Sequence, residues 1–299
     1  MEFATLIAGP TASGKSALAL RLAKSLGGWV VNADSIQVYA DLSVLSARPT
    51  PEEEASVPHR LFGFVPSRAE YSVGRYIADV APLIEAARAG GPPLVIVGGT
   101  GLYFRALTEG LMPSPAIPEV IRAEWRARAA SGEDMHAELH HRDPARAAQL
   151  APRDTPRILR AIELFEATGR RYSDWLRENP GVPLLRKGEW RGAFLNPDRD
   201  WLSRRIDARF LAMLDNGALE EMRRLEAITP PLPANLGVMK AHGAPHLVRH
   251  LSGDMSLEEA IARGQQDTRA YARRQLIFAR RYLAGEAWRW IGSGDDYAA

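Results

Sequence analysis

The N-terminal third of the chain alternates between short apolar runs and stretches with helical periodicity. Apolar runs that predict buried strands cover residues 3–8, 29–34 and 93–97. Helical periodicity covers residues 16–26, with Leu18, Leu22 and Leu26 on one face, and residues 72–89, with Ser72 as the cap. Strands that alternate with helices predict an α/β domain with a parallel sheet, whose ligands bind at the carboxyl ends of the strands.

The middle of the chain follows a different pattern. A proline-rich stretch begins at Pro113, and the helical patterns that follow cover residues 119–131, 135–149 and 155–168. A strand-like run at 192–195 returns the chain to the sheet, and two long helices are expected at 200–215 and 256–283. We therefore predict three parts: an α/β core over residues 1–113, an inserted helical unit over residues 114–191, and completion of the core over residues 192–299.

Composition excludes several classes of protein. No apolar run approaches the roughly 18 residues that a membrane helix needs, and the first residues lead directly into a strand, so we expect neither a membrane span nor a signal peptide. The chain contains no cysteine, which excludes disulfides and thiolate chemistry and suits a reducing cytoplasm. The net charge of +2, from 38 basic and 36 acidic residues, hides an uneven distribution.

The first chemical motif lies between the first strand and the first helix. Its residues match the pattern G-x-x-x-x-G-K-[ST]: Gly9, Pro10, Thr11, Ala12, Ser13, Gly14, Lys15 and Ser16. A strand, a glycine turn and a helix N-terminus direct backbone N–H groups at an anion. Lys15 would reach terminal phosphates, and the Ser16 hydroxyl would lie where Mg²⁺ binds. The alternative is a glycine-rich turn without a ligand. We favour a P-loop NTPase-like core.

Polar residues follow the other two predicted strands. Asp34 and Ser35 end one strand, and Thr100 follows the other, so they should share the sheet edge with the P-loop. Asp34 is placed to act as a general base. Its alternative role is a Walker-B-type acid that holds Mg²⁺. A small-molecule kinase or ATPase is a rival interpretation, although the strand at 93–97 ends in Gly-Gly-Thr rather than in an acid. A third interpretation is a nucleic-acid-binding protein that uses the P-loop only as a switch.

The last predicted helix is unusually basic. Residues 268–285 contain five arginines and no acidic residue, and Arg269, Arg273 and Arg280 lie near one face. The simpler interpretation is a surface helix whose arginines pair with acids elsewhere in the fold. The alternative is a surface for the phosphate backbone of a nucleic acid, to which Arg157 and Arg160 of the insert would contribute.

Several motifs in order along the chain resemble those of the tRNA dimethylallyltransferases, also called tRNA isopentenyltransferases. They are GPTASGKS at residues 9–16, DSIQVY at 34–39, PHRL at 58–61, YSVGRY at 71–76, VGGTGLY at 97–103, RILRAIE at 157–163 and TRAYARRQ at 268–275. The chain departs from the family pattern at residues 42–49 and 236–241. The resemblance covers nearly the whole length.

The resemblance implies an enzyme that transfers a dimethylallyl group from dimethylallyl diphosphate to the exocyclic amine of the adenosine just 3′ of the anticodon in tRNA. The P-loop would then hold a departing diphosphate, with Thr11 and Arg209 completing its cradle and Mg²⁺ as cofactor, bound in part by Ser16. The same loop is expected to accept the phosphates of a nucleotide such as ATP. We expect a cytoplasmic monomer with tRNA and the prenyl donor as its partners.

The implied tRNA contacts come from five segments of the chain. An adenosine in the anticodon loop must be splayed out before its amine can react, and Asp34 is the expected base. The residues expected to contact tRNA are Asp34, Ser35, Ile36, Gln37, Thr100, Arg122, Pro156, Arg157, Ile158, Leu159, Arg160, Arg269 and Arg273.

Overall fold

The computed structural model describes residues 2–297 and divides into two compact units. One unit contains residues 2–108 and 183–297, and the other contains residues 109–182. The second unit thus begins five residues earlier and ends nine residues earlier than the predicted insert, 114–191. Its end differs because Leu185 is fully buried in the core of the first unit and Glu189 pairs with Arg88 there.

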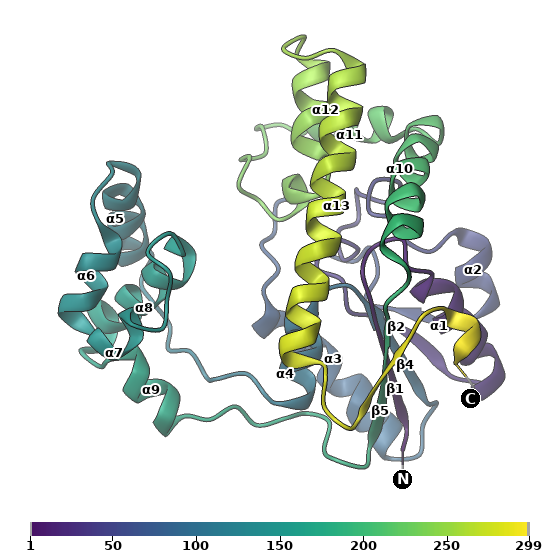
Figure 1. Cartoon of the computed structure of the whole chain (residues 1–299), viewed down its shortest axis with the longest axis horizontal. Helices are drawn as coiled ribbons and strands as arrows, with labels where there is room; N and C mark the ends of the chain where they lie inside the picture. Colours follow the sequence, from purple (N-terminus) through teal and green to yellow (C-terminus); the bar gives the residue numbers. More distant parts are fainter. Residues whose placement is uncertain (1, 298–299) are drawn as a thin grey trace. The chain divides into compact units, whose positions relative to one another are not determined.

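A six-stranded parallel sheet forms the centre of the first unit, in the order β3-β2-β4-β1-β5-β6; β1, β2, β4 and β5 are labelled in Figure 1. The strands are β1 Ala4–Ala8, β2 Trp29–Asn32, β3 His59–Arg60, β4 Leu94–Gly98, β5 Trp190–Leu195 and β6 Trp288–Ile291. The predicted strands β1, β2, β4 and β5 are confirmed, whereas β3 and β6 were not predicted. Because β1 lies between β4 and β5, the loop that follows it leaves the middle of the sheet.

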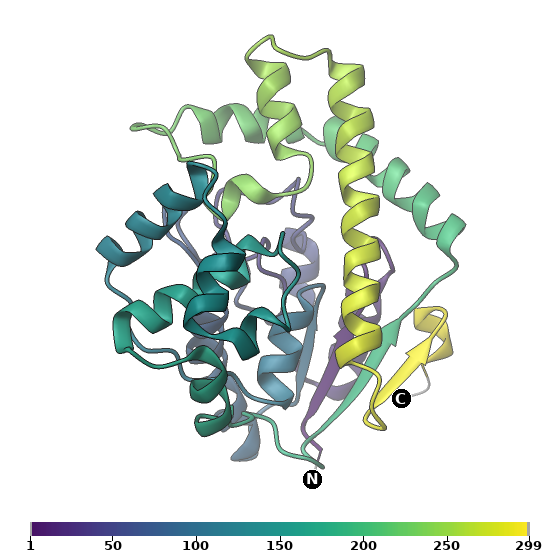
Figure 2. The ribbon, with the colours of Figure 1, turned by 60° about the vertical axis from the view of Figure 1, so that its left-hand side comes forward.

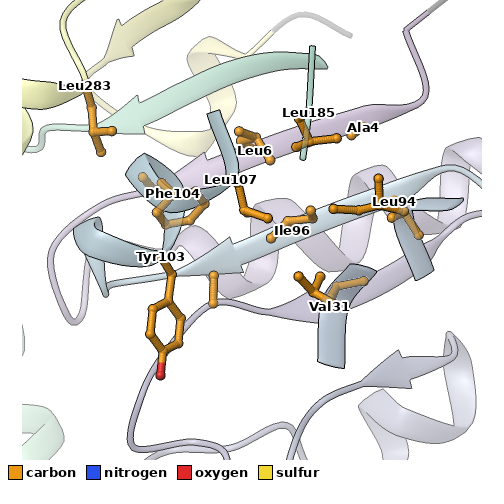
Figure 3. Packing of buried hydrophobic residues seen from close by; sticks show 14 of the residues in the cluster. Ala4, Leu6, Val31, Leu94, Ile96, Tyr103, Phe104, Leu107, Leu185 and Leu283 are labelled. Carbon is orange, nitrogen blue, oxygen red and sulfur yellow. The ribbon is translucent and has the colours of Figure 1, made fainter. Parts of the chain in front are cut away.

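Alternate residues of the strands face two separate hydrophobic layers, as strand geometry requires. Leu6 of β1 and Ile96 of β4 pack against Phe104 and Leu107 of α4, the helix Gly101–Thr108 (Figure 3). On the opposite face, Ile7 belongs to the layer under the helix that follows the P-loop. The parallel α/β architecture expected from the sequence is confirmed.

The helices of the first unit surround this sheet and extend beyond it. Their bounds are α1 Lys15–Leu26, α2 Pro51–Ser56, α3 Val73–Arg88, α4 Gly101–Thr108, α10 Arg199–Asp215, α11 Ala218–Glu226, α12 Ala244–Leu251 and α13 Leu257–Tyr282, with short 3₁₀ turns at Val238–Lys240 and Gly294–Asp296. Ser72 caps α3 as predicted, by accepting from the N–H of Arg75. On the predicted face of α1, Leu18 and Leu22 are buried, whereas Leu26 is exposed at the last turn.

Helix α13 is the longest helix of this unit and connects two cores (Figure 2). Its 26 residues rise about 39 Å at 1.5 Å per residue. Ala260 near its start belongs to a cluster with α11, α12 and the segment after β2, whereas Ala279 near its end packs with the sheet. Between them, Ala272 contacts the P-loop residue Ala12. One helix therefore fixes the P-loop relative to both cores.

The second unit is helical, as predicted. It contains α5 Glu119–Ala130, α6 Met135–Arg142, α7 Pro144–Ala147, α8 Thr155–Thr168 and α9 Tyr172–Glu178, packed around Trp125. The single helix predicted over residues 135–149 is wrong, because the chain breaks at Asp143. Pro144 cannot donate a backbone hydrogen bond, and the Asp143 carboxylate caps the next helix by accepting from the N–H of Arg146 at 3.0 Å.

No helix within residues 2–297 combines the length and the hydropathy that a membrane span requires.

Candidate active site

The P-loop connects β1 to α1 at the carboxyl edge of the sheet. Gly14, at φ 91°, adopts the left-handed conformation that glycine tolerates and directs the chain into the helix. Lys15 and Ser16 are the first residues of α1, so the positive end of the helix dipole and free N–H groups face the loop. This geometry is that of an anion-binding site.

Lys15 is the cation of this loop. Its Nζ donates to the carbonyl of Pro10 at 3.1 Å. Burial lowers the pKa of Lys15 to about 8, the Asp34 carboxylate partly opposes this shift, and the Arg209 guanidinium adds to it. Two cations and one carboxylate thus act on the same small region of the first unit.

Asp34 follows β2 and is held by its own turn. The N–H of Asp34 donates to Asn32 Oδ1 at 2.8 Å, and Asp34 Oδ1 accepts from the N–H of Ile36 at 3.0 Å. The other carboxylate oxygen, Oδ2, lies beside Gly99: a Cβ at that glycine would stand 3.3 Å from it and 2.2 Å from Gln275 Nε2. Gly99 therefore allows the loop after β4 to approach the carboxylate closely.

The neighbours of Asp34 are fixed by hydrogen bonds. Thr100 Oγ1 accepts from the N–H of Ser35 at 3.0 Å and joins the loops after β2 and β4. Gln37 Nε2 donates to the carbonyls of Ser46 and Ala47 at 3.0 and 2.9 Å. The side-chain amide nitrogen of Gln37 thus binds the loop that follows.

A cavity opens between the P-loop, Asp34 and α10. Part of its lining is polar or charged: Thr11, Asp34, Ser46, Arg209, His242, Thr268 and Tyr271. The rest is apolar: Ala12, Ile36, Leu45, Ile206, Phe210 and Met213. The structure therefore brings together all three predicted catalytic residues, Asp34, Thr11 and Arg209. A carboxylate, a guanidinium and an apolar wall in one cavity can hold an anionic head with a hydrocarbon tail.

Burial and the Asp34 carboxylate shift the pKa values of three ionisable groups of this cavity. Burial lowers the pKa of Arg209, and the Asp34 carboxylate opposes this shift. Burial also lowers the pKa of His242 below 6.5, again opposed by Asp34. Tyr271, whose ring lies 4.0 Å from that of His242, has its pKa raised by burial and by Asp34. At neutral pH the imidazole and the phenol are therefore uncharged.

A second cavity is lined by Lys15 itself. Its polar lining consists of Lys15, Ser16, Gln37, Arg48, Glu53 and His59. Within residues 2–297 no cluster of three His, Cys, Asp or Glu side chains could by itself hold a metal ion. The donors here, one hydroxyl and few carboxylates, suit Mg²⁺ that is bound mainly through substrate phosphates and water.

Gln275 is a site residue that the sequence analysis did not identify as such. From the middle of α13, its Oε1 accepts from the N–H of Thr11 at 3.0 Å and its Nε2 donates to the carbonyl of Gly99 at 2.8 Å. The residue is only 8% exposed. The available signal was its place at the end of the TRAYARRQ motif, which the sequence analysis interpreted only through the charge of its arginines.

The basic helix fits each of its two interpretations in part. Arg269 pairs with Asp207 of α10, as the simpler interpretation expected. Arg273 and Arg280 line a groove of about 800 Å³ between α10 and α13, together with Arg199 and Arg269. The groove also contains apolar side chains, among them Ile277, which is 57% exposed.

The predicted tRNA residues of the second unit lie on two helices. Arg122 of α5 pairs with Glu119 at 3.7 Å, and in α8 Arg157 pairs with Asp154 at 3.0 Å. Arg160 lies 3.9 Å from Glu163. Pro156 is exposed in the first turn of α8, Leu159 is half-buried and Ile158 is fully buried in the core of this unit. The Ile158 side chain therefore serves packing, and the arginines and Pro156 provide the accessible surface.

The chain resembles known proteins along almost its whole length. The family model for IPP transferase matches residues 37–282, and that for isopentenyl transferase matches residues 2–62. The tRNA dimethylallyltransferase of Methylocella silvestris is 52% identical over 289 residues, which cover 95% of this chain and 94% of the relative. That of Methylobacterium radiotolerans is 53% identical over 292 residues, 96% of this chain and 92% of the relative.

Solved structures agree with these relatives. The tRNA isopentenylpyrophosphate transferase of Bacillus halodurans is 30% identical, with a TM-score of 0.66 over 97% of this chain and 90% of that one. A eukaryotic dimethylallyltransferase acting on tRNA is 26% identical, with a TM-score of 0.82 over 99% of this chain and 75% of that one. The chain belongs to the tRNA dimethylallyltransferase family of prenyl-transferring enzymes.

Proposed function

We propose that this chain transfers the dimethylallyl group of dimethylallyl diphosphate to the exocyclic amine of the adenosine just 3′ of the anticodon in tRNA. The observation that carries the proposal is the cavity in which Asp34, Arg209 and the P-loop residue Thr11 adjoin an apolar wall. Phosphoryl transfer involves only charged and polar groups at the reacting atoms, so it does not account for apolar side chains beside Asp34 and Arg209. A donor with a charged head and a hydrocarbon tail needs both parts.

The P-loop binds the diphosphate of the donor. The N-terminus of α1 supplies N–H groups and a positive dipole, and Lys15 and Arg209 supply two positive charges. When the bond between C1 of the prenyl group and its oxygen breaks, the diphosphate leaves with the electron pair. Cations already in place stabilise the charge that develops on it, because they need not reorganise during the reaction. Thr11 lies in the same cavity and donates to the leaving oxygens through its hydroxyl.

Asp34 accepts the proton of the amine. The nitrogen forms its new bond to C1 of the prenyl group and loses one proton to the carboxylate, so atoms and charge balance. Asp34 Oδ1 is held by the N–H of Ile36, while Oδ2 lies on the side of Gly99. A base held by its own backbone turn keeps its orientation while the substrate binds, as general-base catalysis requires.

Mg²⁺ is the proposed cofactor, carried on the diphosphate. The Ser16 hydroxyl, beside Lys15 in the second cavity, is the protein group that would hold it. A bound magnesium ion supplies Lewis-acid stabilisation of the leaving diphosphate. The phosphates of ATP would compete for the same loop, without hydrolysis.

The acceptor adenosine enters the cavity from the tRNA. Ser35 and Ile36 follow Asp34 in its turn, Thr100 accepts from the N–H of Ser35, and Gln37 holds the loop that follows; together they shape the place of the base. Exposed arginines, Arg273 of α13 and Arg157 of α8 among them, bind phosphates of the anticodon stem-loop. We further propose that the enzyme acts as a cytoplasmic monomer.

One experiment separates prenyl transfer from nucleotide chemistry. The protein is incubated with an anticodon stem-loop, Mg²⁺ and either dimethylallyl diphosphate or ATP, and the nucleosides are then analysed by mass spectrometry. We expect one adenosine per stem-loop to gain a dimethylallyl group in place of one hydrogen, and inorganic diphosphate to appear in equal amount. Lys15-dependent hydrolysis of ATP with no prenylated nucleoside would contradict the proposal.

A further inference from the structure

The segment of residues 42–47 borders both cavities. It contains turns but neither helix nor strand. Leu45 and Ser46 line the cavity that contains Asp34, whereas Ala47 lines the cavity that contains Lys15. A segment without regular backbone hydrogen bonds needs other partners to keep a fixed position. We call residues 42–47 the wall segment.

Glu221 of α11 supplies those partners. One carboxylate oxygen accepts from the N–H and the hydroxyl of Ser43 and from the N–H of Val44, the last at 2.8 Å. The other oxygen accepts from the N–H of Leu45 at 2.8 Å. The residue is 1% exposed. Three successive backbone N–H groups that converge on one carboxylate form an anion nest, here filled from within the protein.

Hydrogen bonds also hold the C-terminal end of the wall segment. Gln37 holds the carbonyls of Ser46 and Ala47, and the Ser46 hydroxyl donates to the carbonyl of Leu42 at 2.6 Å. Leu45 itself belongs to the buried cluster that includes Phe210. The position of the Leu45 side chain in the cavity is therefore set by polar contacts on both sides of it, and Glu221 supplies four of them.

We propose that Glu221 is a positioning residue that fixes Leu45 as the end of the prenyl pocket and so limits the donor to a five-carbon chain. The inference rests on the proposed function. The hydrocarbon tail occupies the apolar part of the cavity, to which Leu45, Ile206, Phe210 and Met213 contribute. Close-packed walls exclude a longer chain only if they cannot move. A wall made of turns stays in place because its N–H groups are held by a buried carboxylate.

The test compares two donors, dimethylallyl diphosphate and its ten-carbon homologue geranyl diphosphate, on the full chain with an anticodon stem-loop. The quantity measured is the ratio of kcat/KM for the ten-carbon donor to that for the five-carbon donor. Leu45→Ala shortens the wall directly and should raise the ratio about tenfold or more. Glu221→Gln turns one acceptor into a donor that faces backbone N–H groups, and should raise the ratio about fivefold.

Two further variants test whether the donor ratio depends on the position of the Glu221 carboxylate. Glu221→Asp keeps the charge but withdraws the oxygens by one methylene, and should also raise the ratio. Glu220→Gln removes the neighbouring exposed carboxylate, which pairs with Arg223, and should leave the ratio unchanged. These four variants separate the effect of the wall from effects of charge on α11.

The outcomes differ for the two proposals. If Glu221 serves only the stability of the fold, its variants lower the rates with both donors in proportion and leave the ratio at the wild-type value, which overturns the inference. An unchanged ratio in Leu45→Ala overturns it as well, and does not depend on how the Glu221 variants fold. A wild-type protein that fails to transfer even the five-carbon group contradicts the proposed function instead.

Discussion

The backbone N–H of Thr11 donates to the side-chain oxygen of Gln275 at 3.0 Å, across a sequence separation of 264 residues. The amide nitrogen of the same glutamine reaches the carbonyl of Gly99 at 2.8 Å. One buried side chain from α13 thus connects the P-loop to the loop after β4. The position of the P-loop relative to Asp34 therefore depends on this bridge, because Gly99 adjoins Asp34 Oδ2.

Replacing Gln275 should disturb the P-loop without touching the substrate contacts of Asp34. Gln275→Leu leaves a buried N–H and a buried carbonyl without partners, which costs about 1–3 kcal/mol of stability for each group. We expect kcat/KM for the prenyl donor to fall about tenfold or more, since the loop loses its fixed geometry. Steady-state kinetics and thermal unfolding measure the two effects. Glu258→Leu, at an exposed position in the first turn of the same helix, is the control, and an equal loss of kcat/KM there would contradict the account.

Lys15 should be required for the donor but not for the fold. Lys15→Met removes the cation that faces the diphosphate, so both donor affinity and turnover should drop, each about tenfold or more. Lys24→Met, an exposed lysine in the last turn of the same helix, should behave like wild type. Competition by inorganic diphosphate provides a second readout. An unaltered inhibition constant for diphosphate in Lys15→Met would show that the loop binds something else.

His242 should make the protein sensitive to acid. Burial lowers the pKa of its imidazole below 6.5; Asp34 and Asp267 oppose this shift and Arg274 adds to it. The unfolded chain therefore binds more protons than the folded one below 6.5, and stability is lost as pH falls from there toward the folded pKa. Between about pH 7 and about pH 5, the free energy of unfolding should fall more in wild type than in His242→Phe, which keeps a ring against Tyr271.

Nuclear magnetic resonance measures the pKa of His242 in the folded protein directly. The ring protons of His242 should titrate with a midpoint below 6.5. A midpoint above that value, or identical acid sensitivity of the wild type and His242→Phe, would disprove the assignment.

Two arginines of α13 should differ in their effects on tRNA binding. Arg273 is exposed and lines the groove, so Arg273→Ala should lower the slope of log K against log salt by roughly 0.7, the value for one phosphate contact on a single strand. Arg269 already pairs with Asp207, so Arg269→Ala should lower thermal stability and change the slope less. Salt titrations of stem-loop binding by both variants decide this. Equal slopes for Arg273→Ala and wild type would remove this groove from the tRNA surface.

The elements that follow from local pattern were predictable from the sequence. β1, β2 and β4 are apolar runs because both faces of the sheet are covered. The P-loop is recognised by the spacing of its glycines and its lysine. β3, with two residues, is too short to carry a pattern. The break at Asp143 was missed because helical periodicity resumes after it, although Pro144 was the available signal.

The contacts that organise the site depend on residues far apart in sequence. Gln275 and Glu221 act on loops more than 170 residues away, and nothing in their local sequence shows that they are buried. Asp34 was predictable because it ends an apolar strand at the edge where parallel strands present ligands. The apolar wall of Leu45, Phe210 and Met213 assembles only when α10 packs beside the P-loop.

The most direct test of the account is the single-turnover rate of prenyl transfer to an anticodon stem-loop in Asp34→Asn, measured together with the affinity for dimethylallyl diphosphate. The asparagine keeps an oxygen for the N–H of Ile36, so the turn should persist while the base is lost. We predict a rate at least ~10²-fold below wild type with donor affinity within about twofold. A near wild-type rate, or a loss confined to donor or Mg²⁺ affinity, would contradict the assignment of Asp34 as the base.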